Sequence, residues 1–260
     1  MKYIAFTFDD GRSDNYLLAK RIMDKYQFCG TVYITTGFID GTWKESDILK
    51  SPTRPLTAKE INALHASGWE IGLHGDKHKT QIEDMQIALE KLLSWGIANC
   101  GWGISVPNSS ASEAEVKALL ESTYGKKTVY IRRGRKCDTS KLKNKVLYAL
   151  YSILKLKWAY RRFNAENTFL RESCNRSNIP SVVVKSNDRA NIILDFIEAL
   201  PDNSVVVLML HSILSSDHAM CGKDPWSWDK KNFEMLCTGL KSMENNKDLK
   251  VKTLMEIIKG

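Results

Sequence analysis

Two short stretches of the sequence carry side chains that are suited to metal chemistry. Asp9 and Asp10 form an acidic pair before Gly11, and His74 and His78 are separated by three residues. Imidazole and carboxylate groups are ligands that Zn²⁺ and related divalent ions take in proteins. Two histidines and one carboxylate would leave a coordination position open for water, which is typical of a catalytic rather than a structural metal site. The other carboxylate of the pair could then take a proton.

A third candidate is His211, which directly follows the apolar run Val205–Leu210. It is either a core histidine or a general acid with a pKa of about 6–7 that protonates a leaving group. The first two motifs also have structural explanations. The acidic pair can form a plain Asp-Gly turn, and the His-x-x-x-His spacing, which places both rings on one side of a helical turn, also occurs in exposed polar turns.

Strands and helices are predicted to alternate along the whole chain. Apolar and β-branched runs indicate strands, and apolar residues at helical spacing indicate helices. This alternation favours a single α/β domain over residues 1–260 with a mostly parallel sheet, either a barrel or a doubly wound sheet. The main predicted strands are Lys2–Phe8, Thr31–Thr35, Trp69–Leu73, Trp102–Val106, Lys127–Arg132, Ser181–Lys185 and Ser204–Leu210, and the main helices are Asn15–Lys25, Thr57–Ser67, Ile82–Trp95, Ser112–Ser122, Asn187–Leu200, Trp228–Met243 and Thr253–Ile258.

Several predicted strands end in the polar residues already named. Asp9 follows the first strand, His74 the third, and His211 the last long one. In parallel α/β folds the carboxyl ends of the strands lie at one face, and that face holds the site. We therefore expect these distant residues to converge.

The composition is that of a globular protein. The 260 residues are 43% hydrophobic and 26% charged, which excludes long disorder and fibrous repeats. A net charge of +8 suggests anionic partners. A nucleic acid is not expected, because no recognition helix, aromatic platform or zinc-finger spacing accompanies the charge. We expect a cytoplasmic protein, because no secretory signal is recognisable and six scattered cysteines lack a Cys-x-x-Cys motif.

Three motifs resemble those of the polysaccharide deacetylases of carbohydrate esterase family 4. Thr7-Phe8-Asp9-Asp10-Gly11 matches the first family motif, the residues from His74 to His78 match both histidines of the second, and Leu208-Met209-Leu210-His211 matches the last. Their order and spacing fit the family over essentially the whole chain.

This resemblance implies a distorted (β/α)7 barrel with a metal-dependent hydrolase site. Asp9 would be the general base and His211 the general acid. Asp10, His74 and His78 would bind a divalent metal, usually zinc, with cobalt, nickel or manganese as alternatives. The implied reaction removes an acetyl or other short acyl group from an N-acetylated amino sugar. The alternative is a catalytically inactive carbohydrate-binding pseudoenzyme of the same fold.

The chain departs from the family pattern in the remaining motifs. Gly75 replaces a serine or threonine that braces the metal loop. Ser105-Val106-Pro107-Asn108 stands where the family has Arg-Pro-Pro-Tyr, as in an arginine-free branch, and Arg132 or Arg133 is a candidate substitute for the missing arginine. Pro107 and Asn108 belong to this third motif, and the Asn108 backbone N–H could serve the oxyanion.

The fourth motif is not recognisable, so nothing in the sequence indicates what tunes His211. Trp226 and Trp228 follow His211 in the sequence, and they could either line a sugar-binding pocket or pack in the core.

Residues 141–163 form a basic amphipathic segment without acidic residues. Its apolar positions fall on one helical face, so it could rest on an anionic membrane surface or be an ordinary barrel helix with solvated lysines. Some relatives in the family act on lipid-linked sugars at the cytoplasmic membrane face. We therefore expect the substrate to be a cytoplasmic glycan, glycoside or lipid-linked intermediate, with possible peripheral contact at the inner membrane face.

Overall fold

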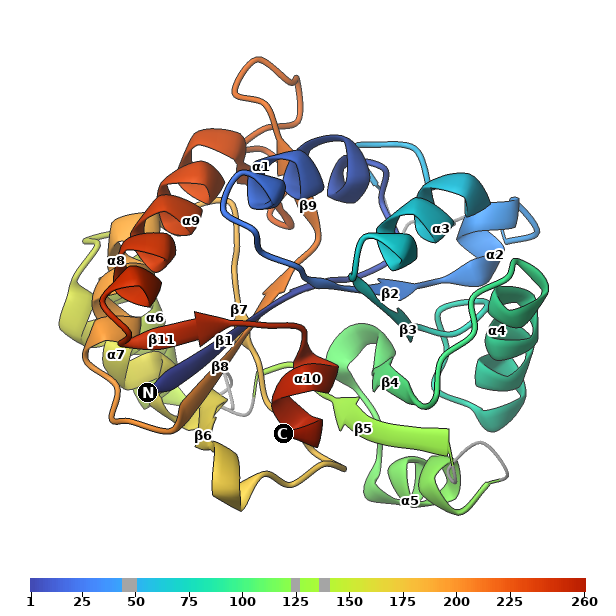
Figure 1. Cartoon of the computed structure of the whole chain (residues 1–260). Coiled ribbons are helices and arrows are strands. Elements are labelled where there is room, and N and C mark those ends of the chain that lie inside the picture. The colour runs from blue at the N-terminus through green and yellow to red at the C-terminus, as the bar shows by residue number, and fades with distance from the viewer. Residues whose placement is uncertain (44–50, 123–126, 136–140) are drawn as a thin grey trace.

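A curved, mostly parallel sheet forms the centre of the protein, and helices cover its outer side (Figure 1). The computed structural model describes residues 1–43, 51–122, 127–135 and 141–260. Neighbouring strands follow the order β5-β4-β3-β2-β1-β8, all of them paired in parallel. The strands are β1 Lys2–Phe8, β2 Thr31–Ile34, β3 Glu70–Leu73, β4 Trp102–Ser105, β5 Thr128–Arg132, β6 Thr168–Leu170, β7 Val182–Val183, β8 Ser204–Leu210, β9 Ser212–Leu214, β10 Ser227–Asp229 and β11 Leu249–Val251.

The helices connect successive strands as the alternating sequence pattern predicts. Thr57 and Glu60 form a capping box at the start of α3, in which the Glu60 backbone N–H donates to Thr57 Oγ1 at 3.2 Å. The helices are a π-helical stretch Asn15–Lys20 running into α1 Arg21–Asp24, α2 Thr36–Asp40, α3 Ala58–Ala66, α4 Ile82–Ser94, α5 Glu113–Glu121, α6 Leu142–Ser152, α7 Lys157–Asn164, α8 Ala190–Glu198, α9 Lys230–Asn245 and α10 Leu254–Lys259.

An irregular segment around residues 179–183 closes the sheet into a barrel. Ile179 pairs in parallel with Arg132 at the end of β5, and Val182 pairs with Leu208 of β8. The seven parallel strands thus form the distorted (β/α)7 barrel that the family resemblance implied. The distortion lies at this closure, where β7 contributes only two residues.

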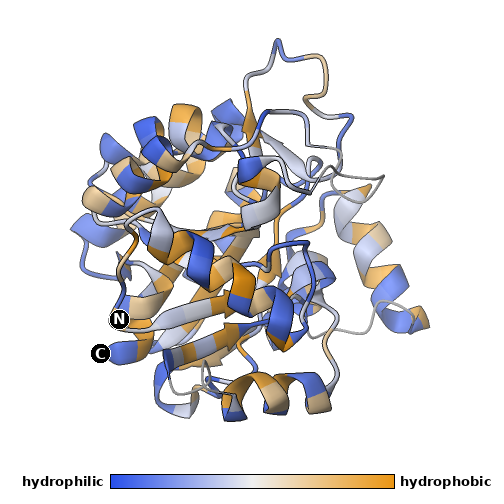
Figure 2. Cartoon of the chain, turned by 90° about the vertical axis from the view of Figure 1, so that its right-hand side faces the viewer, coloured by the Kyte–Doolittle hydropathy of each residue, from blue (hydrophilic) through white to orange (hydrophobic). Residues whose placement is uncertain are grey.

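The core has two parts that lie on opposite sides of the sheet. The larger packs strands such as β1 and β8 against the surrounding helices. The smaller fills the barrel with Tyr33, Tyr130 and Val207, and Leu254 and Ile257 of α10 pack beneath them. Figure 2 shows hydrophobic residues concentrated in the central strands and hydrophilic residues on the outer faces of many helices.

Three details differ from the sequence prediction. Residues 141–163 form two helices, α6 and α7, rather than one continuous amphipathic helix. The chain also contains β6, which pairs antiparallel with β8, and the short pair β9–β10. These strands have three residues each, too few for a repeating pattern to be recognised. No helix in the described part of the chain is long and apolar enough to cross a membrane.

Candidate active site

The carboxyl ends of β1, β3, β4 and β8 meet around a cavity of about 160 Å³. All five residues predicted to bind metal or transfer protons line this cavity, namely Asp9, Asp10, His74, His78 and His211. Asn108 and Trp226 line it as well. The convergence follows from the parallel sheet, because each strand delivers its last polar residue to the same end of the barrel.

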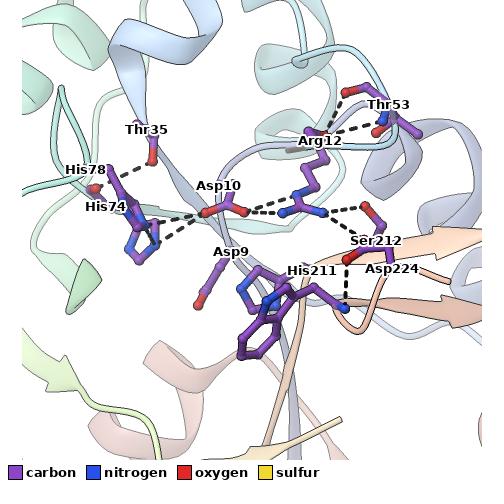
Figure 3. A network of polar contacts seen from close by, with 12 residues as sticks. Asp9, Asp10, Arg12, Thr35, Thr53, His74, His78, His211, Ser212 and Asp224 are labelled. Atoms are coloured by element: carbon purple, nitrogen blue, oxygen red, sulfur yellow. Dashed lines mark hydrogen bonds and ion pairs between the residues drawn. The ribbon is translucent and has the colours of Figure 1, made fainter. Parts of the chain in front are cut away.

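Asp10, His74 and His78 form a group that could hold a metal ion. The Nε2 atoms of His74 and His78 lie 3.2 Å apart. Asp10 Oδ1 lies 3.6 Å from His74 Nε2 and 3.8 Å from His78 Nε2. Ligands about 2.0–2.2 Å from a tetrahedral ion have similar mutual separations. Asp10 Oδ1 is buried and has no hydrogen-bond partner among the described residues. This oxygen points at both imidazoles, so the donor set fits a divalent cation (Figure 3).

Backbone and ring contacts orient the two imidazoles. His74 Nδ1 lies 2.8 Å from the Ser105 carbonyl oxygen, which leaves Nε2 directed at the cavity. The His78 ring stacks on Trp43 with a centroid distance of 6.1 Å. The prediction that both histidines lie on one helical turn was wrong. They lie in a loop, and His78 has a φ of +55°.

Arg12 fixes the other oxygen of Asp10. Its Nε and Nη2 atoms lie 3.0 and 2.9 Å from Asp10 Oδ2, and its Nη1 atom donates to Ser212 Oγ. Burial raises the pKa of Asp10, but the charge of Arg12 and the nearby histidines more than offset it, so the pKa lies well below its usual range. Sequence reasoning missed Arg12. The only feature of the sequence that could have indicated Arg12 is its position directly after Gly11.

Asp9 is held by a different arginine. Arg132 Nη2 lies 2.5 Å from both carboxylate oxygens of Asp9, and Ser105 Oγ lies 3.4 Å from Oδ1. Both charged residues are almost completely buried. Burial raises the pKa of Asp9, and the Arg132 charge, with His74 and His211, more than offsets this, so Asp9 is ionised at neutral pH.

His211 lies across the cavity beside Trp226, with ring centroids 4.7 Å apart. Its backbone carbonyl accepts a hydrogen bond from Asn15 Nδ2 at 2.8 Å. Its Nδ1 atom is buried and has no partner among the described residues. Burial lowers the pKa of His211 to about 4, although the carboxylates of Asp10 and Asp9 act in the opposite direction. The imidazole therefore rests neutral.

The sequence profile described as polysaccharide deacetylase matches residues 1–145. The chain belongs to the polysaccharide deacetylase family. The match contains Asp9, Asp10, His74 and His78 but ends before β8, so it does not include His211. No curated protein matches the chain in sequence.

Solved structures share the fold at low sequence identity. A polysaccharide deacetylase from Bacillus cereus aligns over 97% of this chain and 92% of its own, with a TM-score of 0.52 and 13% identity. A mutant of a family 4 pseudoenzyme with restored enzymatic activity aligns over 98% of this chain and 67% of its own, with a TM-score of 0.53 and 10% identity. A family 4 acetyl xylan esterase from Clostridium thermocellum, solved with a cobalt ion, has a TM-score of 0.49 and 17% identity over 99% of this chain and 90% of its own.

The unusual glycine in the second deacetylase motif has a steric reason. Gly75 has a φ of +80°, and a Cβ atom there would lie against the Asp84 carboxylate and 2.7 Å from the Lys79 carbonyl oxygen. Asp84 braces the loop instead. Its carboxylate accepts the backbone N–H groups of Lys77 and Lys79 at 3.0 to 3.1 Å.

The third deacetylase motif lacks an arginine, and Arg132 occupies the position beside Asp9. Strands β4 and β5 are neighbours, and Ser105 pairs in register with Arg132. An arginine at the end of β5 therefore reaches the carboxylate from the adjacent strand. Arg133, the other candidate, points elsewhere and contacts the Ala111 carbonyl and Glu113.

Of the remaining predicted site residues, some line the cavity and others do not. Trp226 lines the cavity, whereas Trp228 is buried and donates its indole N–H to the Asp188 carbonyl at 2.8 Å. Asn108 lines the cavity with a φ of +54°, but Pro107 is buried and does not line it. Pro107 therefore acts as a turn residue, and Arg132 lies behind Asp9 rather than at the cavity surface.

Proposed function

We propose that the protein is a metal-dependent hydrolase that removes an acetyl group from an N-acetylated amino sugar. The observation that carries this proposal is the buried, unpartnered Asp10 Oδ1 facing two imidazole nitrogens, in the same cavity as the ionised Asp9. A pseudoenzyme of the same fold is the competing function. The presence of all five ligand and proton-transfer residues in one cavity favours an enzyme.

Asp10, His74 and His78 would hold the ion, and zinc is the first choice because its ligands are imidazole and carboxylate. Cobalt, nickel and manganese are alternatives. A divalent ion held there would supply Lewis acidity toward the acetyl carbonyl and toward water. Three protein ligands leave room for those groups on the cavity side.

Asp9 is the proposed general base. It is ionised at neutral pH and faces the cavity beside the metal ligands, so it can accept a proton from the attacking water. Arg132 holds both carboxylate oxygens and thus sets the direction from which the proton is taken. Arg132 is in this account a positioning residue.

Asn108 and His211 are proposed to act on the other side of the amide. The backbone N–H of Asn108 would stabilise the oxyanion. His211 would protonate the leaving nitrogen. Because His211 rests neutral, it must gain its proton during the cycle, and Asp9, once it has taken a proton from water, is a source inside the same cavity.

Acetate release from N-acetylated sugars tests this function. We expect zinc-loaded wild type to release acetate, Asp9→Asn to keep stoichiometric zinc but lose at least 100-fold in kcat, and Asp10→Asn to lose zinc binding. Glu83→Gln, an exposed carboxylate outside the cavity, is the control. Equal activity in wild type and Asp9→Asn would contradict the assignment of the base, and zinc binding without any turnover would favour the pseudoenzyme.

We also propose that α6 and α7 contact an anionic membrane surface on the cytoplasmic side. Leu142, Ile153, Leu154 and Trp158 are 57 to 77% exposed, which is unusual for large apolar side chains. Lys141, Lys143, Lys145 and Arg162 are exposed in the same segment, which contains no acidic residue. Apolar groups flanked by cations fit an anionic bilayer. The free cysteines of the described chain are consistent with a reducing compartment.

Sedimentation with liposomes tests the membrane contact. We expect salt-sensitive binding to vesicles with anionic lipid and little binding to neutral vesicles. The double variant Ile153→Ser with Trp158→Ser should lose most of this binding. Met235→Ser removes a similarly exposed apolar side chain on α9 and should not. Binding that is unchanged in the double variant would contradict the proposal.

A further inference from the structure

A second hollow of about 340 Å³ lies beside the catalytic cavity. Arg135, Lys145 and Lys185 line it together with Asn144 and Tyr148, so every lining residue can donate a hydrogen bond and three carry a positive charge. No carboxylate is among these described lining residues. A concave surface with this lining is complementary to an anion.

An aromatic ring holds the Arg135 guanidinium in place. Its guanidinium carbon lies 4.5 Å from the centroid of the Phe163 ring, which fixes the plane of the group. Its Nε and Nη2 atoms are buried and have no hydrogen-bond partner among the described residues. These two atoms are too deeply buried to be reached from solvent, so Arg135 acts on a ligand in the hollow mainly through its positive charge.

Lys185 connects the hollow to the catalytic cavity. Its Nζ atom lies 4.9 Å from the centroid of the Trp226 ring, and Trp226 lines the cavity beside His211. Burial and the charge of Arg135 lower the pKa of Lys185, which indicates that like charges are held close together. A bound anion would relieve this repulsion.

The buried carboxylate of Asp188 compensates these charges only in part. Asp188 is buried, and its Oδ2 atom accepts the backbone N–H of Lys185 at 2.8 Å. Burial raises the pKa of Asp188 to about 6, and the charges of Arg135, Lys155 and Lys185 act against this shift. Lys155 donates to the Asn187 carbonyl and is not part of the lining. The hollow therefore keeps an excess of positive charge.

We infer that this hollow, defined by Arg135, Lys145 and Lys185, binds a phosphate group of the substrate while its N-acetylated sugar occupies the catalytic cavity. This inference rests on the proposed function and narrows the substrate to a phosphorylated N-acetyl amino sugar. Trp226 forms the wall between the two positions, with His211 on one side and Lys185 against its ring. A phosphate fits better than a carboxylate because the three cationic groups surround one volume and a phosphate offers more acceptor oxygens.

Calorimetric binding to zinc-loaded Asp9→Asn protein, which should not consume the sugar, tests the inference. The probes are methyl N-acetylglucosaminide 6-phosphate, neutral methyl N-acetylglucosaminide and the 6-carboxylate analogue of the latter, so that both anionic groups stand at the same position of the sugar. We expect the phosphate to bind at least tenfold more tightly than the neutral sugar. Adding Lys145→Gln or Lys185→Gln should remove most of this preference, and Lys185→Arg should restore it. Lys143→Gln, which removes an exposed lysine of α6 outside the hollow, should leave it unchanged.

Three results would overturn the inference: equal affinity for the phosphorylated and neutral sugars, a preference that survives both glutamine variants, or a carboxylate that binds as tightly as the phosphate. The second result would mean that the phosphate binds elsewhere, for example at the zinc ion. Failure of the proposed function gives a different pattern. Zinc-loaded wild type would then release no acetate from either sugar, whereas the phosphate preference would remain. Turnover of both sugars with equal KM would contradict the hollow alone.

Discussion

Two adjacent carboxylates have different surroundings because different arginines hold them, and we propose different roles for them on this ground. Asp10 has a φ of +77°, which turns it away from the strand direction toward the two histidines, and Arg12 occupies only its second oxygen. Asp9 remains in the β1–β8 ladder through its N–H bond to the Leu210 carbonyl, and Arg132 holds both of its oxygens. Asp10 therefore keeps one oxygen without a partner among the described residues, as the proposed metal ligand requires, whereas both oxygens of Asp9, the proposed base, are held.

The sequence allowed part of this arrangement to be predicted. Asp9, Asp10, His74, His78 and His211 stand out because their types and positions at strand ends suit a metal hydrolase. Arg12 did not stand out, because a single arginine has no distinguishing spacing, and the contact of Ser105 with Asp9 was not predicted. Their roles depend on which strands become neighbours. Arg132 was one of two candidates, and only the β4–β5 register separates it from Arg133.

Replacement of Arg132 should affect the base without affecting the ion. We expect Arg132→Gln to lower kcat/KM by about 10- to 100-fold and to leave the zinc content unchanged, because Arg132 contacts Asp9 and no metal ligand. Removing one partner of this buried pair should also cost about 3–5 kcal/mol of the free energy of unfolding.

One control variant and one double variant show whether the effect of Arg132→Gln comes from its pairing with Asp9. Arg133→Gln should leave activity close to that of wild type. Adding Asp9→Asn to Arg132→Gln should recover part of the lost stability, because no unpaired charge then stays buried. A zinc content that falls with Arg132→Gln, or full activity in that variant, would contradict the role of Arg132. Urea unfolding, metal analysis and acetate release provide the three measurements.

At the scale of elements, the metal loop depends on the first turn of α4. Asp84 lies in that turn and accepts backbone N–H groups from the loop that carries His78. Gly75 gives the loop the room to approach this carboxylate. The histidine spacing alone suggested a helical turn. The positive φ values of Gly75 and His78 that define the actual loop leave no periodic signal in the sequence.

Removal of this brace should weaken metal binding. We expect Asp84→Ala to lower zinc affinity by about 10- to 100-fold, because the loop N–H groups lose their acceptor and His78 loses its fixed position. Glu83→Ala, the neighbouring exposed residue of the same helix turn, is the matched control. Competition with a chromogenic chelator measures both affinities. Equal zinc affinity in Asp84→Ala and wild type would show that the loop holds its shape without Asp84.

Over the whole molecule, the alternating strands and helices could be predicted because the strands are mostly apolar and β-branched runs and the helices carry apolar residues at helical spacing. The closure of the barrel could not. It depends on residues 179–183, where Ile179 pairs with β5 and Val182 with β8 in an irregular segment. Periodicity therefore left a barrel and a doubly wound sheet equally open, and the family motifs made the choice.

The neutral His211 should make the metal-free protein sensitive to acid. Its pKa is about 4 in the folded state against about 6.5 when unfolded, so the unfolded chain binds the proton first. The contribution of His211 to the free energy of unfolding is present above about pH 6.5 and is lost as the pH falls toward 4. In chelator, wild type should lose up to about 3 kcal/mol more than His211→Gln between pH 7.5 and 4, an upper bound because the ring is partly exposed to the cavity. Urea unfolding of both proteins across this range measures the difference, and parallel pH profiles would contradict it.

The position of a bound ion decides whether Asp10, His74 and His78 form a metal site. A crystal structure of the protein with zinc, with anomalous data on both sides of the zinc edge, identifies the metal and its ligands in one measurement. We expect one zinc peak at about 2.0–2.2 Å from Asp10 Oδ1, His74 Nε2 and His78 Nε2, with Asp9 outside the coordination sphere. A peak bound elsewhere, or no peak at these three residues in protein saturated with zinc, would contradict this assignment.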